Sequence, residues 1–120
     1  MSTTGRQRIL IVDDDPRIVR FIRVKLTASG YQVFTAAGGE EALDVVRDSR
    51  PDIMILDIIM PGMDGFKVLQ QVRGSSSMPV IALSARSENG PKALSLGACD
   101  FIVKPFDVDS LVTMIQEKLG

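Results

Sequence analysis

Four short apolar runs in this chain each stop at a polar side chain, and this pattern constrains the fold more than any other feature. The runs lie at residues 9–12, 53–56, 80–83 and 101–103. The polar residues that follow them are Asp13 with Asp14, then Asp57, Ser84 and Lys104. Ligands of an open parallel sheet bind beyond the carboxyl ends of its strands. If the runs are neighbouring strands, these side chains converge at one edge, where they suit a divalent metal ion and a phosphoryl group.

The spacing of apolar residues predicts strands that alternate with helices. Strands are expected at about 8–12, 32–35, 53–56, 79–83 and 100–103. Several of these lack polar alternation, as strands buried on both faces do. Asp15 before Pro16 predicts the start of the first helix and Gly30 its end, and Asp107 predicts the cap of the fifth. The resulting α/β pattern, βα repeated five times, indicates a parallel sheet with helices on both faces.

Length and composition limit the possible classes of function. With 120 residues the chain predicts one domain, at 8–119, after a disordered or extended segment at 1–7. The net charge of −1 and the lack of tryptophan argue against direct nucleic-acid binding. No apolar stretch approaches the roughly 18 residues of a membrane span. The single Cys99 fits a reducing compartment. We therefore expect a soluble cytoplasmic protein that contacts no membrane.

Each polar residue at the strand ends also has an ordinary structural explanation. Asp13 and Asp14 are compatible with a solvated acidic turn, Asp57 with a strand terminator, Ser84 with a turn residue and Lys104 with a surface lysine. These explanations become improbable together, because each would have to place a suitable group at the same end of a different strand by accident.

The chemistry of the set favours phosphoryl transfer to an aspartate. Adjacent carboxylates such as Asp13 and Asp14 repel unless a cation lies beside them, and Mg²⁺ prefers oxygen ligands. Near a metal, the Asp57 carboxylate can act as a nucleophile towards phosphorus. Lys104 can anchor phosphoryl oxygens, and Pro105 after it can fix a cis peptide. The chain has no histidine, but an aspartate is already ionised at neutral pH and requires no base.

Four motifs resemble the receiver domain of bacterial two-component response regulators. They are residues 9–16 (ILIVDDDP), 57–65 (DIIMPGMDG), 82–85 (ALSA) and 104–106 (KPF). The resemblance extends from about residue 7 to 119. It implies a flavodoxin-like (βα)5 fold, with a five-stranded parallel sheet in the order 2-1-3-4-5.

The resemblance also implies roles for the residues of the site. Asp57 is expected to be the phosphoacceptor. Asp13, Asp14 and Asp57 are expected to hold Mg²⁺, or Mn²⁺ as a substitute, with the backbone carbonyl of Ile59 as a further ligand. Lys104 is expected to pair with Asp57 and later with the phosphoryl group. The chain would then not be an enzyme, apart from self-phosphorylation by small donors and slow self-dephosphorylation.

Two further residues are expected to couple phosphorylation to a change of surface. Ser84 would hydrogen-bond a phosphoryl oxygen and so move the loop after strand four. Phe101, at the switch-aromatic position, would turn inward and reshape the face of helix four, strand five and helix five. The segment from Ser84 to Lys104 is about two residues shorter than is usual in the family, so we expect helix four to be short, starting late near residues 89–91 and stopping at Gly97.

The residues two places beyond Asp57 and Ser84 are Ile59 and Arg86. The resemblance implies that both flank the position where water attacks the acyl phosphate, and a bulky apolar residue and a long cation there would shield it. We therefore expect slow loss of phosphate.

The expected partners are a sensor histidine kinase or phosphotransfer protein and an unknown downstream effector, with the chain a monomer or weak dimer. A receiver fragment of a DNA-binding regulator and a stand-alone receiver both remain open. Helix five, residues 110–118, lacks the arginines expected for the dimer face of the winged-helix subfamily.

Three other classes of protein compete with this interpretation. An aspartate-nucleophile phosphatase of the haloacid dehalogenase type needs Asp-x-Asp after strand one, which Asp13 and Asp15 satisfy formally. A pseudo-receiver would bind partners without phosphate. A flavodoxin-like FMN binder would need a phosphate-cradling loop where this chain has carboxylates.

Overall fold

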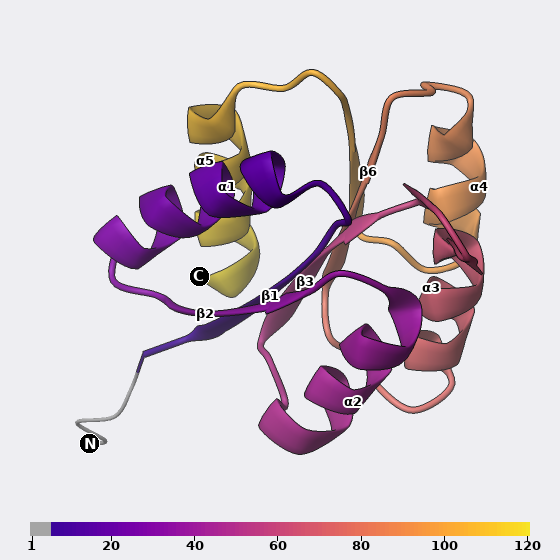
Figure 1. The fold of residues 1–120 in the computed structure, drawn as a ribbon, viewed down its shortest axis with the longest axis horizontal. Helices are drawn as coiled ribbons and strands as arrows, with labels where there is room; N and C mark the ends of the chain where they lie inside the picture. The colour runs from indigo at the N-terminus through magenta and orange to yellow at the C-terminus, as the bar shows by residue number, and fades with distance from the viewer. Residues whose placement is uncertain (1–5) are drawn as a thin grey trace.

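The computed structural model describes residues 6–120. A five-stranded parallel sheet runs through its centre in the order β2-β1-β3-β6-β7 (Figure 1). The strands are β1 (Arg8–Val12), β2 (Gln32–Ala36), β3 (Ile53–Asp57), β6 (Val80–Ser84) and β7 (Asp100–Val103). The predicted strand order is therefore confirmed. Of the segment 1–7, predicted to be disordered or extended, residues 1–5 lie outside the described residues.

Within residues 6–120, five helices cover the two faces of the sheet, as Figure 1 shows. One face carries α1 (Pro16–Ala28) and α5 (Val108–Leu119). The other carries α2 (Gly39–Ser49), α3 (Gly65–Arg73) and α4 (Asn89–Ser95). Because both faces are covered, the central strands β3 and β6 are buried along their whole length, which explains their continuous apolar sequence.

Successive residues of each strand enter two separate hydrophobic cores. In β1, Ile9 and Ile11 lie in the core under α1 and α5, whereas Leu10 and Val12 lie in the core under α2, α3 and α4. Side chains two residues apart point to the same face of a sheet. The β3 residues Ile53 and Ile55 belong to the α1–α5 core, and Asp57 continues that series. Ser84, in contrast, follows Ala82 of the core on the opposite face.

The helix ends agree with the capping residues predicted from the sequence. An Asp15 side-chain oxygen accepts a hydrogen bond of 2.9 Å from the backbone N–H of Arg17, and Pro16 begins α1. Asp107 caps α5 in the same way. Since Gly30 has a φ of +95°, the chain turns there into β2 as expected for glycine. These local signals therefore set the limits of α1 and the start of α5.

One detail near the carboxyl edge differs from the predicted pattern. The loop after β3 contains a small antiparallel pair, β4 (Ile59–Met60) and β5 (Met63–Asp64), which the sequence did not indicate. Helix α4 is short, as predicted, and its last residue is Ser95. Leu96 forms its C-cap, and Gly97, with a φ of +110°, follows the cap just as Gly30 follows Ser29 at the end of α1.

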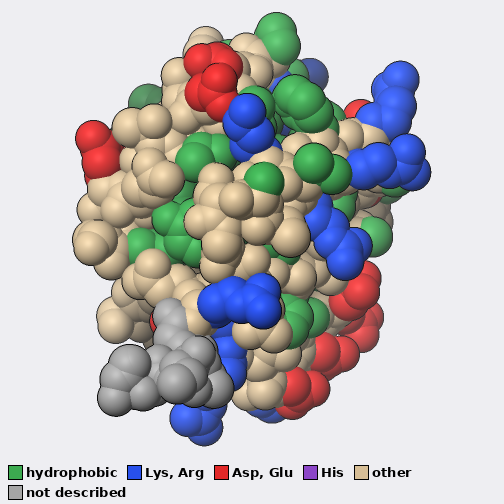
Figure 2. Space-filling model, turned by 90° about the vertical axis from the view of Figure 1, so that its left-hand side faces the viewer, with side chains coloured by type: hydrophobic (Ala, Val, Ile, Leu, Met, Phe, Trp, Pro, Cys, Tyr) green, Lys and Arg blue, Asp and Glu red, His purple; other side chains and the backbone are tan. Residues whose placement is uncertain are grey.

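The described part of the chain has no helix long and apolar enough to cross a membrane. Figure 2 shows the surface on the left-hand side of Figure 1, turned to face the viewer. Basic and hydrophobic side chains are interspersed there, and acidic side chains lie at the top, at the left edge and in a larger group at the lower right. This face therefore carries no uniform basic surface.

Candidate functional site

Three charged side chains from separate strands meet at the carboxyl edge of the sheet. Asp13 follows β1, Asp57 ends β3 and Lys104 follows β7. The Nζ of Lys104 lies 2.9 Å from Oδ2 of Asp13 and 3.3 Å from Oδ2 of Asp57. Both carboxylates are buried, with residue exposures of 2% and 4%. The lysine ammonium therefore bridges two carboxylates that are largely removed from water.

Asp14 completes an acidic cluster with Asp13 and Asp57. One carboxylate oxygen from each residue lies within 4.8 Å of the others. Asp14 is exposed to solvent, and one oxygen of Asp13 also accepts a bond of 2.9 Å from the backbone N–H of Asp15. Three carboxylates and one ammonium give the site a net charge of about −2. Hard oxygen donors with excess negative charge fit Mg²⁺ or Mn²⁺, so the residues present suit such an ion.

Asp57 is the carboxylate whose protonation is most strongly perturbed. Burial is the largest cause, and repulsion from Asp13 adds to it. Attraction and a hydrogen bond from Lys104, together with the Ile59 N–H, offset these effects only in part. The pKa of Asp57 is consequently raised from 3.8 to about 6. Without a further cation, the ionised form of this side chain is costly.

Lys104 responds in the opposite sense. Burial lowers the pKa of its ammonium, but the hydrogen bond and attraction to Asp13, with a smaller contribution from Asp57, outweigh burial and raise the pKa above its ordinary value. Lys104 is therefore fully charged at neutral pH. Sequence reasoning paired Lys104 with Asp57 alone and missed Asp13, its nearer partner.

Ser84 lies at the same edge but is held by a different set of groups. Its residue is fully buried, and its Oγ accepts hydrogen bonds from Nδ2 of Asn89 at 3.0 Å and from the backbone N–H of Arg86 at 3.1 Å. The backbone carbonyl of Ser84 accepts from the N–H of Lys104 at 2.8 Å. The contact with Asn89 was not predicted. The only available signal was an amide side chain at the expected start of the helix after β6.

The remaining predicted residues lie around this edge. Ile59 is half-exposed, and its N–H donates to Oδ1 of Asp57 at 3.3 Å. Ile59 and the exposed Arg86 line one open groove, together with Asn89. Phe101 is partly buried against the core under α2, α3 and α4. The structure thus brings Ile59 beside Asp57 and Arg86 beside Ser84. Phe101 lies near the start of β7, away from the carboxyl end of that strand.

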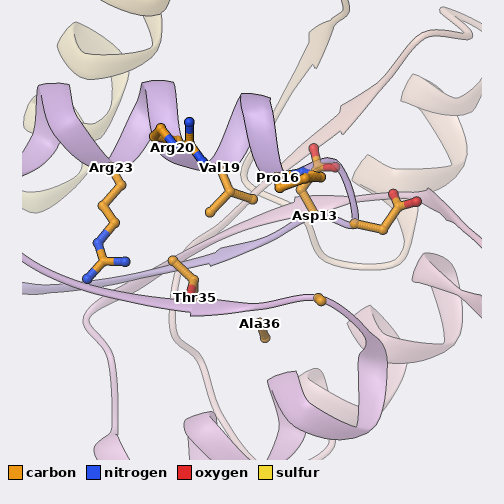
Figure 3. Close-up of a pocket in the computed structure, with 9 residues that line it drawn as sticks. Asp13, Pro16, Val19, Arg20, Arg23, Thr35 and Ala36 are labelled. Carbon is orange, nitrogen blue, oxygen red and sulfur yellow. The ribbon is translucent and has the colours of Figure 1, made fainter.

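A pocket of about 380 Å³ opens from the acidic pair between α1 and the end of β2. Figure 3 shows Asp13 at one end of this pocket and Arg23 at the other, with Val19 and Thr35 between them. Asp14 also lines it. The acidic cluster is therefore reached from solvent on this side, which leaves room for a hydrated cation.

Asp15 does not join the acidic cluster. Its side chain accepts from the N–H of Arg17 and forms an ion pair of 3.6 Å with that arginine, so it serves the start of α1. The sequence therefore contains the Asp-x-Asp motif of a haloacid dehalogenase-type phosphatase. Its second aspartate, Asp15, does not lie in the acidic cluster, where it would have to act as the acid.

Comparison with known proteins identifies close similarity over most of the chain. The family model described as "Response regulator receiver domain" matches residues 9–116. The transcriptional regulatory protein KdpE of Mycobacterium tuberculosis is 43% identical over 110 residues, covering 90% of this chain and 49% of KdpE. This chain spans about half the length of the curated relatives it matches.

Solved structures agree with this comparison. Chemotaxis response regulator CheY4 of Vibrio cholerae has a TM-score of 0.88 at 33% identity, with 94% of this chain and 98% of CheY4 covered. The BeF3-activated N-terminal receiver domain of Klebsiella pneumoniae RstA has a TM-score of 0.86 at 28% identity, with 92% and 97% covered.

Proposed function

Since this chain belongs to the response regulator receiver domain family, we propose that Asp57 accepts the phosphoryl group in a two-component signalling pathway. The observation that supports the proposal is that the Lys104 ammonium contacts the carboxylates of both Asp13 and Asp57. A carboxylate at the end of a buried strand, beside a fixed cation and a cation-binding cluster, is suited to attack phosphorus.

The donor in this proposal is a phosphohistidine of a sensor kinase or phosphotransfer protein. An oxygen of Asp57 forms a bond to phosphorus as the phosphorus–nitrogen bond of the donor breaks. The electron pair of the broken bond remains on the imidazole nitrogen, which takes a proton from solvent. Asp57 thereby becomes an acyl phosphate. Lys104 would then turn from the two carboxylates to the phosphoryl oxygens.

Asp13, Asp14 and Asp57, with the backbone carbonyl of Ile59, would hold Mg²⁺ or Mn²⁺. Such an ion supplies charge neutralisation and orientation of phosphoryl oxygens when bound. The donor is anionic and the site carries a net charge of about −2, so their approach is repulsive without compensation. We therefore propose that phosphorylation requires the divalent ion.

The output of the phosphorylated form would be a changed surface on α4, β7 and α5. Ser84 and Phe101 are the proposed switch residues, because both side chains lie on the sheet face that α4 covers. KdpE is named as a transcriptional regulatory protein. We propose that this chain likewise acts on transcription through a DNA-binding effector outside the 120 residues, since its net charge is −1 and it spans about half the length of that relative.

The test is phosphorylation by acetyl phosphate, followed by intact-mass measurement. Wild-type protein in Mg²⁺ should gain one phosphoryl group, and an excess of EDTA should abolish the gain. Asp57→Asn should not be modified. The matched control Asp48→Asn changes an exposed carboxylate on α2 and should behave as wild type.

Two results would contradict the proposal. Modification that persists in EDTA would reject the role of the metal. Repeated turnover of an aryl phosphate would instead favour the phosphatase alternative.

A further inference from the structure

The hydroxyl group of Ser84 is held at the start of α4. Ser84 continues the strand positions that face α2, α3 and α4, whereas Asp57 continues the positions of the opposite core. The Ser84 Oγ accepts hydrogen bonds from Asn89 Nδ2 at 3.0 Å and from the Arg86 N–H at 3.1 Å. A serine oxygen has two acceptor lone pairs, so both are engaged by the loop and first residue of α4.

The same turn of α4 contacts the switch aromatic. Gly90 follows Asn89 and is buried. A Cβ atom at Gly90 would lie 2.9 Å from Cδ2 of Phe101, so the ring packs directly against the backbone of this turn. Any displacement of Asn89 and Gly90 therefore changes the space available to Phe101. One short turn links the Ser84 hydroxyl to the aromatic ring.

We propose that Asn89 is a positioning residue that holds the Ser84 side chain in its unphosphorylated orientation by donating to its oxygen, and that Ser84 must leave this orientation before its O–H can donate to a phosphoryl oxygen on Asp57. This inference rests on the proposed function. The Asn89 bond is made when Ser84 faces α4 and is lost when Ser84 turns to the phosphoryl group. It therefore stabilises the resting form only. One such hydrogen bond biases an equilibrium by about two- to tenfold.

The experiment titrates the 120-residue protein with beryllofluoride, a phosphoryl mimic, in the presence of Mg²⁺. Amide NMR signals of Gly90 and Leu94 report the state of α4. Asn89→Ala removes the bond, so the active form becomes more populated. The half-saturating beryllofluoride concentration should fall by about two- to tenfold. Asn89→Ser, whose side chain is too short to reach Ser84, should give the same shift.

Glu88→Ala is the matched control. Glu88 precedes Asn89 and forms no capping hydrogen bond with its side chain, so this variant should titrate as wild type. A double-mutant cycle separates positioning of Ser84 from general loosening of α4. In a Ser84→Ala background, Asn89→Ala should cause no further shift, whereas a merely structural role would give the same shift in both backgrounds.

The possible failures are distinguishable. If wild type binds beryllofluoride and Asn89→Ala has an equal or higher half-saturating concentration, the inference is overturned and the proposed function stands. An equal shift in both Ser84 backgrounds overturns it as well. If wild type binds no beryllofluoride with Mg²⁺, the proposed function itself is overturned, and the inference with it.

Discussion

The ammonium of Lys104 lies closer to Asp13, at 2.9 Å, than to Asp57, at 3.3 Å. Asp13 is also the more buried of the two carboxylates. The Lys104 ammonium therefore neutralises mainly Asp13, a proposed metal ligand, and only secondarily Asp57, the proposed phosphoacceptor. Burial, together with repulsion from Asp13, raises the pKa of Asp57 to about 6, and the more distant ammonium offsets this only in part.

Lys104→Met should destabilise the metal-free protein because two buried carboxylates lose their shared cation. We expect a loss of roughly 3 kcal/mol in the free energy of unfolding, near the lower end of the cost of breaking a buried ion pair. Mg²⁺ should restore much of this loss. Urea titrations with and without Mg²⁺ measure both effects. Lys67→Met, at an exposed lysine of α3, is the control, and an equal loss in that variant would contradict the argument.

Phosphorylation by acetyl phosphate should depend on pH through Asp57. Because its pKa is raised to about 6, mainly by burial, the reactive carboxylate is lost as pH falls through that value. A bound divalent ion favours the ionised form, so increasing Mg²⁺ should move the acidic limb of the rate profile to lower pH. Initial rates at pH 5 to 8, at low and high Mg²⁺, test this. A limb that does not move with Mg²⁺ would be inconsistent with a shared site.

Asp57→Asn should stabilise the metal-free protein at neutral pH. The pKa of Asp57 in the folded protein, about 6, lies above the value of 3.8 for the unfolded chain. Between about pH 4 and 6 the folded protein therefore binds a proton at Asp57 that the unfolded chain has already released. The contribution of Asp57 to stability consequently falls as pH rises through this range. The variant removes this cost, on the order of 3 kcal/mol at pH 7.

The gain should be smaller at pH 4.5, where the wild-type carboxyl group is largely protonated. Thermal unfolding at the two pH values in EDTA provides the measurement. A variant less stable than wild type at pH 7 would rule out this electrostatic cost.

Gly90→Ala should disturb the packing between α4 and Phe101. The new Cβ would come within 2.9 Å of the ring, so either the ring or the helix turn must move. We expect a loss of about 1–3 kcal/mol, as for overpacking of a core. In the background of Phe101→Leu, which removes the ring, the same substitution should cost less. Equal costs in both backgrounds, measured by urea unfolding, would show that the ring is not the obstacle.

Ile59 and Arg86 should control the lifetime of the phosphoryl group. Both residues line an open groove next to the Asp57 loop, where they are expected to limit the approach of water to an acyl phosphate. Ile59→Ala and Arg86→Ala should therefore each accelerate the loss of phosphate from Asp57. Time courses of phosphoryl loss after removal of the donor measure this. Lys92→Ala, in the same groove but further along α4, should have a smaller effect, and a wild-type half-life of seconds would argue against shielding.

Periodicity and caps in the sequence determined the sheet, its helices and the edge where the polar residues meet. Buried parallel strands have apolar residues throughout, so Asp13, Asp57, Ser84 and Lys104 stand out at their ends. The helix starts at Asp15 and Asp107 are equally local, because a capping side chain bonds to backbone only two residues away.

Only the tertiary structure decided which groups touch at that edge. The nearer pairing of Lys104 with Asp13 spans 91 residues and depends on how far a long side chain reaches across neighbouring strands. The bond from Asn89 to Ser84 and the contact of Gly90 with Phe101 depend on the path of one short loop. Such contacts depend on distances of a few tenths of an ångström, and residue type and spacing do not specify these.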